Sequence, residues 1–175
     1  MGGRVSPHPT RPARCFEKDL IVSRELFTQT PLRQITRADG VAKEIRVQDG
    51  HMFVCNGCCC GRTEKGFPAV PLDEFKRQWK ERGIRRRFHL TISGCLGPCP
   101  LANVVLILFR GRSAWFHSIN SPVDVGLLYD YVERMLRSES YLHPPLELAG
   151  RQFERYIAET AASECYFERA AAGCL

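Results

Sequence analysis

The cysteines of this 175-residue chain constrain its structure more than any other residue type. Most of its nine cysteines lie in two short segments, VCNGCCCG (Cys55, Cys58, Cys59, Cys60) and SGCLGPCPLAN (Cys95, Cys99). If the outer cysteines of the first segment are used, the spacing is C-x4-C followed by C-x3-C. Four thiolates on two short loops can enclose one metal centre, and thiolates are soft ligands that bind iron or zinc.

Composition favours a globular protein with enough chain for one buried core. The hydrophobic fraction of 44% and the charged fraction of 25% are ordinary, and no apolar run approaches the roughly 20 residues of a membrane span. The first residues lack the apolar core of a secretory signal, so we expect a cytoplasmic protein without membrane contact. In a reducing cytosol, clustered cysteines indicate metal or redox chemistry rather than structural disulfides.

The net charge of +6 is spread unevenly. Basic side chains crowd one stretch and comprise Lys76, Arg77, Lys80, Arg82, Arg85, Arg86 and Arg87. Two interpretations stay open: a solvated helix face, or a docking surface for an acidic protein partner, whose encounter rate such a field would raise. No stacking platform or base-reading motif accompanies the charge, so nucleic acid is not the expected partner.

Hydrophobic periodicity predicts an α/β domain over residues 46–140. The expected elements are a strand at 51–54, a helix at 71–83, a strand at 86–93, a strand at 104–109 buried on both faces, its hairpin partner at 113–119, and a helix from 121. This order is that of a thioredoxin-like sandwich with a mixed sheet of about four strands and flanking helices. Both cysteine segments follow strands, so their loops can lie side by side at one end of the sheet.

Two flanking segments lie outside this domain. Residues 1–45, rich in Pro, Arg and Thr, are expected to be flexible or loosely docked. Residues 141–175 are expected to form a C-terminal helical extension, with a helix over about 146–171. Cys15, Cys165 and Cys174 fall in these flanks and are interpreted as incidental thiols.

A cluster of two irons and two sulfides (2Fe–2S) needs two protein ligands on each iron. Cys55 and Cys60 could hold one iron while Cys95 and Cys99 hold the other. The plant-type C-x4-C-x2-C run is absent, because Thr63 occupies the position where it requires a cysteine. Glycines without Cβ would let backbone N–H groups approach the sulfurs, and the candidates are Gly57, Gly61, Gly94 and Gly97.

These segments resemble a known family. The spacing, together with CLGPCPLANVV, is similar to that of thioredoxin-like 2Fe–2S ferredoxins, including the small 2Fe–2S subunit of NADH–quinone oxidoreductase. The string VCNGCCCGRTEKGFP resembles a stand-alone bacterial branch often associated with cobalamin synthesis. The resemblance covers about residues 51–136. It implies a single-electron carrier rather than an enzyme, with redox proteins as partners and either a monomeric or a homodimeric state.

The resemblance also implies a ligand set. Cys55, Cys60, Cys95 and Cys99 fall on the four ligand positions of the family's 2Fe–2S cluster. The triple cysteine leaves Cys58 or Cys59 as an alternative to Cys60.

Two other functions remain open. A zinc-binding structural or interaction module could use Cys55, Cys58, Cys95 and Cys99, although zinc sites more often pair two C-x2-C knuckles. A thiol–disulfide oxidoreductase could use the CNGC pair Cys55 and Cys58. No clear helix follows Cys58 to lower its thiolate pKa, and this second function would leave Cys95 and Cys99 without a role.

Overall fold

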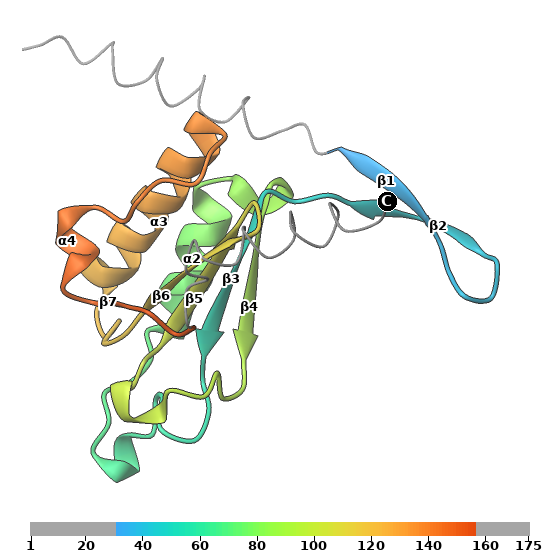
Figure 1. Cartoon of the computed structure of the whole chain (residues 1–175). Helices are drawn as coiled ribbons and strands as arrows, with labels where there is room; N and C mark the ends of the chain where they lie inside the picture. Colours follow the sequence, from blue (N-terminus) through green and yellow to red (C-terminus); the bar gives the residue numbers. More distant parts are fainter. Residues whose placement is uncertain (1–30, 157–175) are drawn as a thin grey trace, which may run out of the picture.

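A five-stranded mixed sheet organises the part of the chain that the computed structural model describes, residues 31–156 (Figure 1). The strand order is β4-β3-β5-β6-β7, with β3 parallel to β4 and every other pairing antiparallel. The strands are β3 (Gly50–Cys55), β4 (Phe88–Ser93), β5 (Val105–Phe109), β6 (Arg112–Phe116) and β7 (Gln152–Phe153). The α/β class and a mixed sheet are confirmed, and the two-residue β7 adds a strand to the four that were expected.

Two helices, α2 (Leu72–Glu81) and α3 (Pro122–Ser138), pack against each other over one face of the sheet (Figure 1). The Tyr129 hydroxyl of α3 donates a hydrogen bond to the Phe75 carbonyl of α2 at 2.8 Å. Three short 3-10 helices connect the elements: η1 (Thr63–Lys65), η2 (Ile84–Arg86) and η3 (Cys99–Leu101). No helix within residues 31–156 is long and apolar enough to cross a bilayer.

Local sequence explains where these helices begin and end. Ser121 caps α3 in a capping box, accepting from the Asp124 N–H while the Asp124 carboxylate accepts from the Ser121 N–H. Helix α2 begins after Pro71, and Gly83 adopts the left-handed conformation (φ 69°) just beyond its end. These boundaries agree with the predicted helices.

Strand β5 differs from its prediction, because it is buried on one face instead of two. Val105, Ile107 and Phe109 are buried against the helices, whereas Leu106 is half-buried and Leu108 is 37% exposed. The cause is the helix arrangement: α2 and α3 lie on the same side, so among the described elements no helix covers the other face of the sheet.

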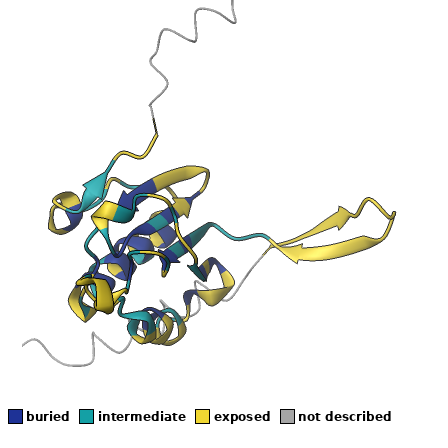
Figure 2. Cartoon of the chain, turned by 90° about the horizontal axis from the view of Figure 1, so that it is seen from below, coloured by how far each residue is buried: buried dark blue, intermediate teal, exposed yellow. Residues whose placement is uncertain are grey.

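An N-terminal hairpin projects from this domain, in a region where no element was predicted. Its strands β1 (Leu32–Thr36) and β2 (Ala42–Arg46) pair antiparallel, and every residue in them is exposed (Figure 2). Gly40 supplies the left-handed turn residue (φ 81°). The hairpin therefore contributes no side chain to the buried core.

The C-terminal prediction is wrong within the described residues. The helix that begins at Leu146 ends at Ala149 (α4), and Gln152–Phe153 pairs with β6 as strand β7. Leu148 is buried in the core, while Phe153 packs on Trp115 with ring centroids 5.9 Å apart. The rest of the expected helix, residues 157–171, lies outside the described part, as do Cys15, Cys165 and Cys174.

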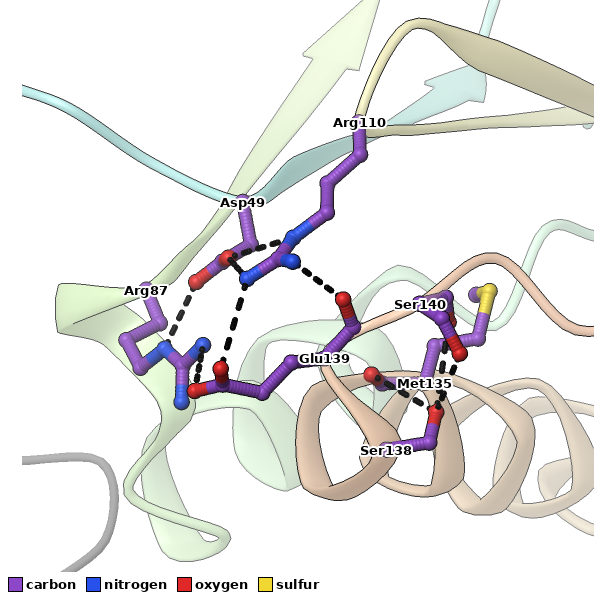
Figure 3. Close-up of polar contacts among 7 residues, drawn as sticks. All are labelled: Asp49, Arg87, Arg110, Met135, Ser138, Glu139 and Ser140. Atoms are coloured by element: carbon purple, nitrogen blue, oxygen red, sulfur yellow. Dashed lines mark hydrogen bonds and ion pairs between the residues drawn. The ribbon is translucent and has the colours of Figure 1, made fainter.

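A charged cluster lies at the end of the sheet where β3 and β4 begin, opposite the ends that carry the cysteine loops. Figure 3 shows its side chains. Asp49, just before β3, accepts hydrogen bonds from Arg87 at 2.6 Å and from Arg110 at 2.8 Å. Arg87 also reaches Glu139 beyond α3 at 3.4 Å, and Arg110 donates to the Glu139 carbonyl. Three strands and a helix are thus joined through one network, in which Arg87 is buried while Arg110 and Glu139 are exposed.

Candidate metal centre

The two cysteine loops meet at one end of the sheet, as their positions after neighbouring strands predict. Cys55 at the end of β3 lies opposite Ser93 at the end of the parallel strand β4, and the Asn56 N–H donates to the Ser93 carbonyl at 3.1 Å. Gly57 then approaches the second loop so closely that a Cβ placed on it would lie 2.7 Å from the Cys95 nitrogen. The loops touch because this position has no side chain.

Cys55 and Cys60 form an inner pair of thiols. They are 4% and 2% exposed, and they pack with Val104 and Trp115. Burial, followed by the thiol contact with Cys60, raises the pKa of Cys55 to about 12, although a hydrogen bond from the Leu96 backbone opposes the rise.

Cys58, Cys95 and Cys99 form an outer group nearer the surface. The Cys58 sulfur lies 2.9 Å from the Cys99 sulfur and 3.5 Å from the Cys95 sulfur, and the Cys95 and Cys99 sulfurs are 3.2 Å apart. The sulfurs of Cys58, Cys59 and Cys99 also lie within 4.8 Å of one another. Cys58, Cys59 and Cys99 could therefore hold a metal ion.

Thiol contacts distribute the protons of the outer group unequally. The side-chain contacts with Cys99, and then with Cys95, lower the pKa of Cys58 because they favour its thiolate. The same contact with Cys58, and then that with Cys95, raises the pKa of Cys99 to about 12. Burial, with the charge of Cys58, raises the pKa of Cys59. In the metal-free protein Cys58 is therefore the favoured thiolate, and a metal ion would displace protons from its neighbours.

Asn103 holds the first loop in place, although no role was predicted for it. Its side-chain oxygen accepts from the Gly61 N–H at 3.1 Å, and its amide donates to the carbonyls of Pro68 and Ala69 at 3.1 and 3.0 Å. Its own backbone N–H donates to the Cys60 sulfur at 3.1 Å. Asn103 is 1% exposed and has a left-handed backbone (φ 53°), a conformation that asparagine tolerates better than most residues. The sequence signal that could have indicated this role is an asparagine directly after a cysteine loop.

Of the four glycines expected to bring a backbone N–H to a sulfur, only Gly97 does so among the described contacts, whereas the Gly61 N–H donates to the Asn103 side chain. The Gly97 N–H donates to the Cys95 sulfur at 3.3 Å. A Cβ on Gly97 would lie 2.7 Å from the Arg155 guanidinium, which places a cation over the second loop. Gly94 has open space around it, so it makes no such approach.

The surroundings of the sulfurs fit a metal–thiolate centre. Backbone N–H groups donate to the sulfurs of Cys55, Cys60 and Cys95, as is common around iron–sulfur clusters, where such bonds tune the potential. The indole N–H of Trp115, in the cluster that contains the inner pair, is buried without a hydrogen-bond partner among the described residues. A sulfur acceptor would suit an unpaired donor of this kind.

Comparison with known proteins leaves the family open: no family model matches the chain, and no curated protein matches it significantly. The geometry thus defines a cysteine cluster on two touching loops. It brings Cys55 to Cys60 and Cys95 to Cys99, and it places Cys58 and Cys59 beside Cys99.

Proposed function

We propose that this protein is a single-electron carrier that binds a 2Fe–2S cluster between its two cysteine loops. One observation carries the proposal: each loop presents a pair of neighbouring sulfurs, Cys55 with Cys60 and Cys95 with Cys99, and the loops touch at Gly57. Two thiolates per iron is the ligand arrangement of a diiron cluster. When bound, the cluster would supply one-electron oxidation and reduction.

The chain itself would set the environment of the bound group. The backbone N–H groups of Leu96, Gly97 and Asn103 donate hydrogen bonds to cysteine sulfurs. These bonds would stabilise the more negative, reduced state of a bound cluster. Val104 and Trp115 shield the inner pair from water. Cys95 lies in the exposed loop, so the outer side would be the route by which a redox partner approaches.

Cys60 is the better second ligand among the three consecutive cysteines. Its thiol is buried beside Cys55 and receives the Asn103 N–H, whereas Cys58 is exposed and contacts Cys95 and Cys99. In the proposed centre Cys58 is a spare thiol next to the outer iron.

A thioredoxin-like frame is part of the proposal. The β3-α2-β4 unit gives a parallel pair with a helical crossover, and the β5-β6 hairpin followed by α3 completes the order expected for such a sandwich. The resemblance of both cysteine segments to ferredoxins covers the same elements. It extends the proposal to electron supply for cobalamin synthesis, with acidic redox proteins as partners.

Anaerobic purification tests the proposal directly. We expect brown protein with about two irons and two labile sulfides per chain, charge-transfer absorption in the visible, and a rhombic paramagnetic signal after reduction. Colourless protein that lacks iron and sulfide after anaerobic purification would contradict it.

A zinc-binding module is the second candidate, because three sulfurs of the outer group already lie within 3.5 Å of one another. Cys58, Cys95 and Cys99 could occupy three corners of a tetrahedral site, with Cys55 as the fourth ligand. Metal analysis separates the candidates, since one zinc without iron supports the module.

A Cys55–Cys58 redox pair has less support, because the thiol contacts of Cys58 are with Cys59, Cys95 and Cys99.

A further inference from the structure

A cavity lies at the edge strand β4, near its first residues and away from the cysteine loops. The cavity has a volume of about 450 Å³, and its lining includes Arg46, Gln48, Trp79, Arg85, Arg86 and His89. Its walls come from the root of the hairpin, the end of α2, η2 and the start of β4. Binding cavities for small molecules typically measure about 300–1,000 Å³.

The lining is strongly basic, since among the described residues it holds three guanidinium groups and no carboxylate. Arg77, Arg82 and Arg87, from the same basic stretch, all form ion pairs with acidic side chains. By contrast, within residues 31–156 neither Arg46 nor Arg85 has a carboxylate at ion-pair distance. Arg77, Arg82 and Arg87 are therefore engaged in the fold, whereas Arg46 and Arg85 line the cavity without an acidic partner among the described residues.

An aromatic wall gives the cavity a fixed shape. The Trp79 indole N–H donates to the Phe88 carbonyl at 2.8 Å, which anchors the ring to the start of β4. The Arg85 guanidinium lies 5.0 Å from the centre of that ring, and the His89 ring stands edge-on to it at 5.9 Å. Stacking on an aromatic ring restrains Arg85 and leaves the N–H groups around the edge of its guanidinium available to a ligand.

We propose that this cavity binds a small phosphate-bearing anion of nucleotide size. Guanidinium groups present paired N–H donors that match phosphate oxygens, and those of Arg46 and Arg85 complement the charge of a polyphosphate. The carboxyl end of α2 at Gly83 carries a partial negative charge of about half a unit, which the three arginines outweigh. The site needs no metal at the cysteine loops, so it stands independently of the proposed function.

Calorimetric titration of the full-length protein with ATP, and separately with inorganic pyrophosphate, at about 0.15 M salt tests the site. We expect saturable binding of ATP at one site per chain, with pyrophosphate as a weaker competitor. Arg46→Gln and Arg85→Gln, made separately, should each weaken ATP binding about tenfold, the loss expected when one charged hydrogen-bond donor is removed. Both side chains are exposed, and unchanged thermal unfolding would confirm folded variants.

Arg33→Gln is the matched control, because Arg33 lies on the same exposed hairpin and does not line the cavity. It removes the same charge and should change ATP affinity less than twofold. Absence of saturable ATP binding, or an equal loss in Arg33→Gln, would overturn the proposal. A single-stranded oligonucleotide that binds more tightly than ATP and is not displaced by it would also overturn it, in favour of a nucleic-acid surface.

Discussion

The backbone N–H of Asn103 donates a hydrogen bond to the buried sulfur of Cys60 at 3.1 Å. The residue that follows the second cysteine loop thereby touches a proposed ligand on the first. The Asn103 side chain also binds the Gly61 N–H and two carbonyls of the segment after it. The geometry of the inner pair consequently depends on a residue that is itself no metal ligand.

Asn103→Ala should destabilise the protein by about 2–4 kcal/mol, because it leaves buried N–H and C=O groups without partners. Metal content should fall as well, since the first loop loses its anchor. Urea unfolding and metal analysis would measure both effects. Asn120→Ala is the control: it removes a single partner, the amide oxygen 2.7 Å from the Asn103 nitrogen, and should cost about 1 kcal/mol. Equal effects of the two substitutions would contradict this role for Asn103.

Gly57→Ala should reduce metal binding by forcing the loops apart, because the new Cβ would lie 2.7 Å from the Cys95 nitrogen. Gly94→Ala offers a close control, as a Cβ at Gly94 meets no atom within 4 Å. We expect iron content to drop in the first variant and to remain at the wild-type level in the second. The same iron content in both variants would show that contact between the loops is not required.

Cys60→Ser should lose the cluster or leave it labile, whereas Cys58→Ser should retain it. The structural reason is that the Cys60 sulfur is buried beside Cys55 while the Cys58 sulfur is exposed. Iron, sulfide and the visible spectrum of each anaerobically purified variant provide the measurement. The reverse result would assign Cys58 in place of Cys60 as a ligand of the cluster.

In the metal-free, reduced protein, iodoacetamide should label Cys58 before Cys55. The contacts with Cys99 and Cys95 lower the pKa of Cys58, so a larger thiolate fraction is present near neutral pH. Burial raises the pKa of Cys55 to about 12 and also blocks access to its sulfur. Mass spectrometry of timed digests would rank the sites, and faster labelling of Cys55 would contradict the described packing.

Asp49→Asn should destabilise the protein near neutral pH by about 2–3 kcal/mol, because Arg87 would remain buried without its main partner. Burial raises the pKa of Asp49, but hydrogen bonds and charges from Arg87 and Arg110 outweigh it and hold the pKa below 3.8. A lowered folded-state pKa gives stability that is present above pH 3.8 and is lost as pH falls through the folded value.

The difference in stability between wild type and Asp49→Asn should therefore shrink below about pH 4. Urea unfolding at several pH values would show this convergence. Asp130→Asn, at an exposed ion pair with Arg82, should change stability by less than about 1 kcal/mol at every pH. A difference between wild type and Asp49→Asn that is independent of pH would count against the ionic role of Asp49.

Local patterns in the sequence were sufficient to predict the central helices. Leu72, Phe75 and Trp79 repeat at helical spacing in α2, and Ser121 with Pro122 marks the start of α3, so each helix follows from nearby residues. The meeting of the cysteine loops was also predictable, since both follow adjacent parallel strands.

Features that depend on distant contacts were not predictable in the same way. Strand β7 exists because Gln152 and Phe153 pair with β6, although the predicted helix over about 146–171 included both residues. The roles of Asn103 and of the Arg46–Arg85 cavity arise from segments far apart along the chain. Likewise, periodicity could not show that α2 and α3 share one face and leave Leu108 exposed.

The parallel pairing of β3 with β4 has a consequence for assembly of the protein in the cell. Cys55 and Cys95 become neighbours only after the crossover through α2 has folded, and closing so long a loop carries an entropic cost that local elements do not bear. A nascent polypeptide would therefore lack a complete set of sulfurs until translation has passed well beyond the second loop. Insertion of the inorganic group would then be a late maturation step, performed on a preformed scaffold.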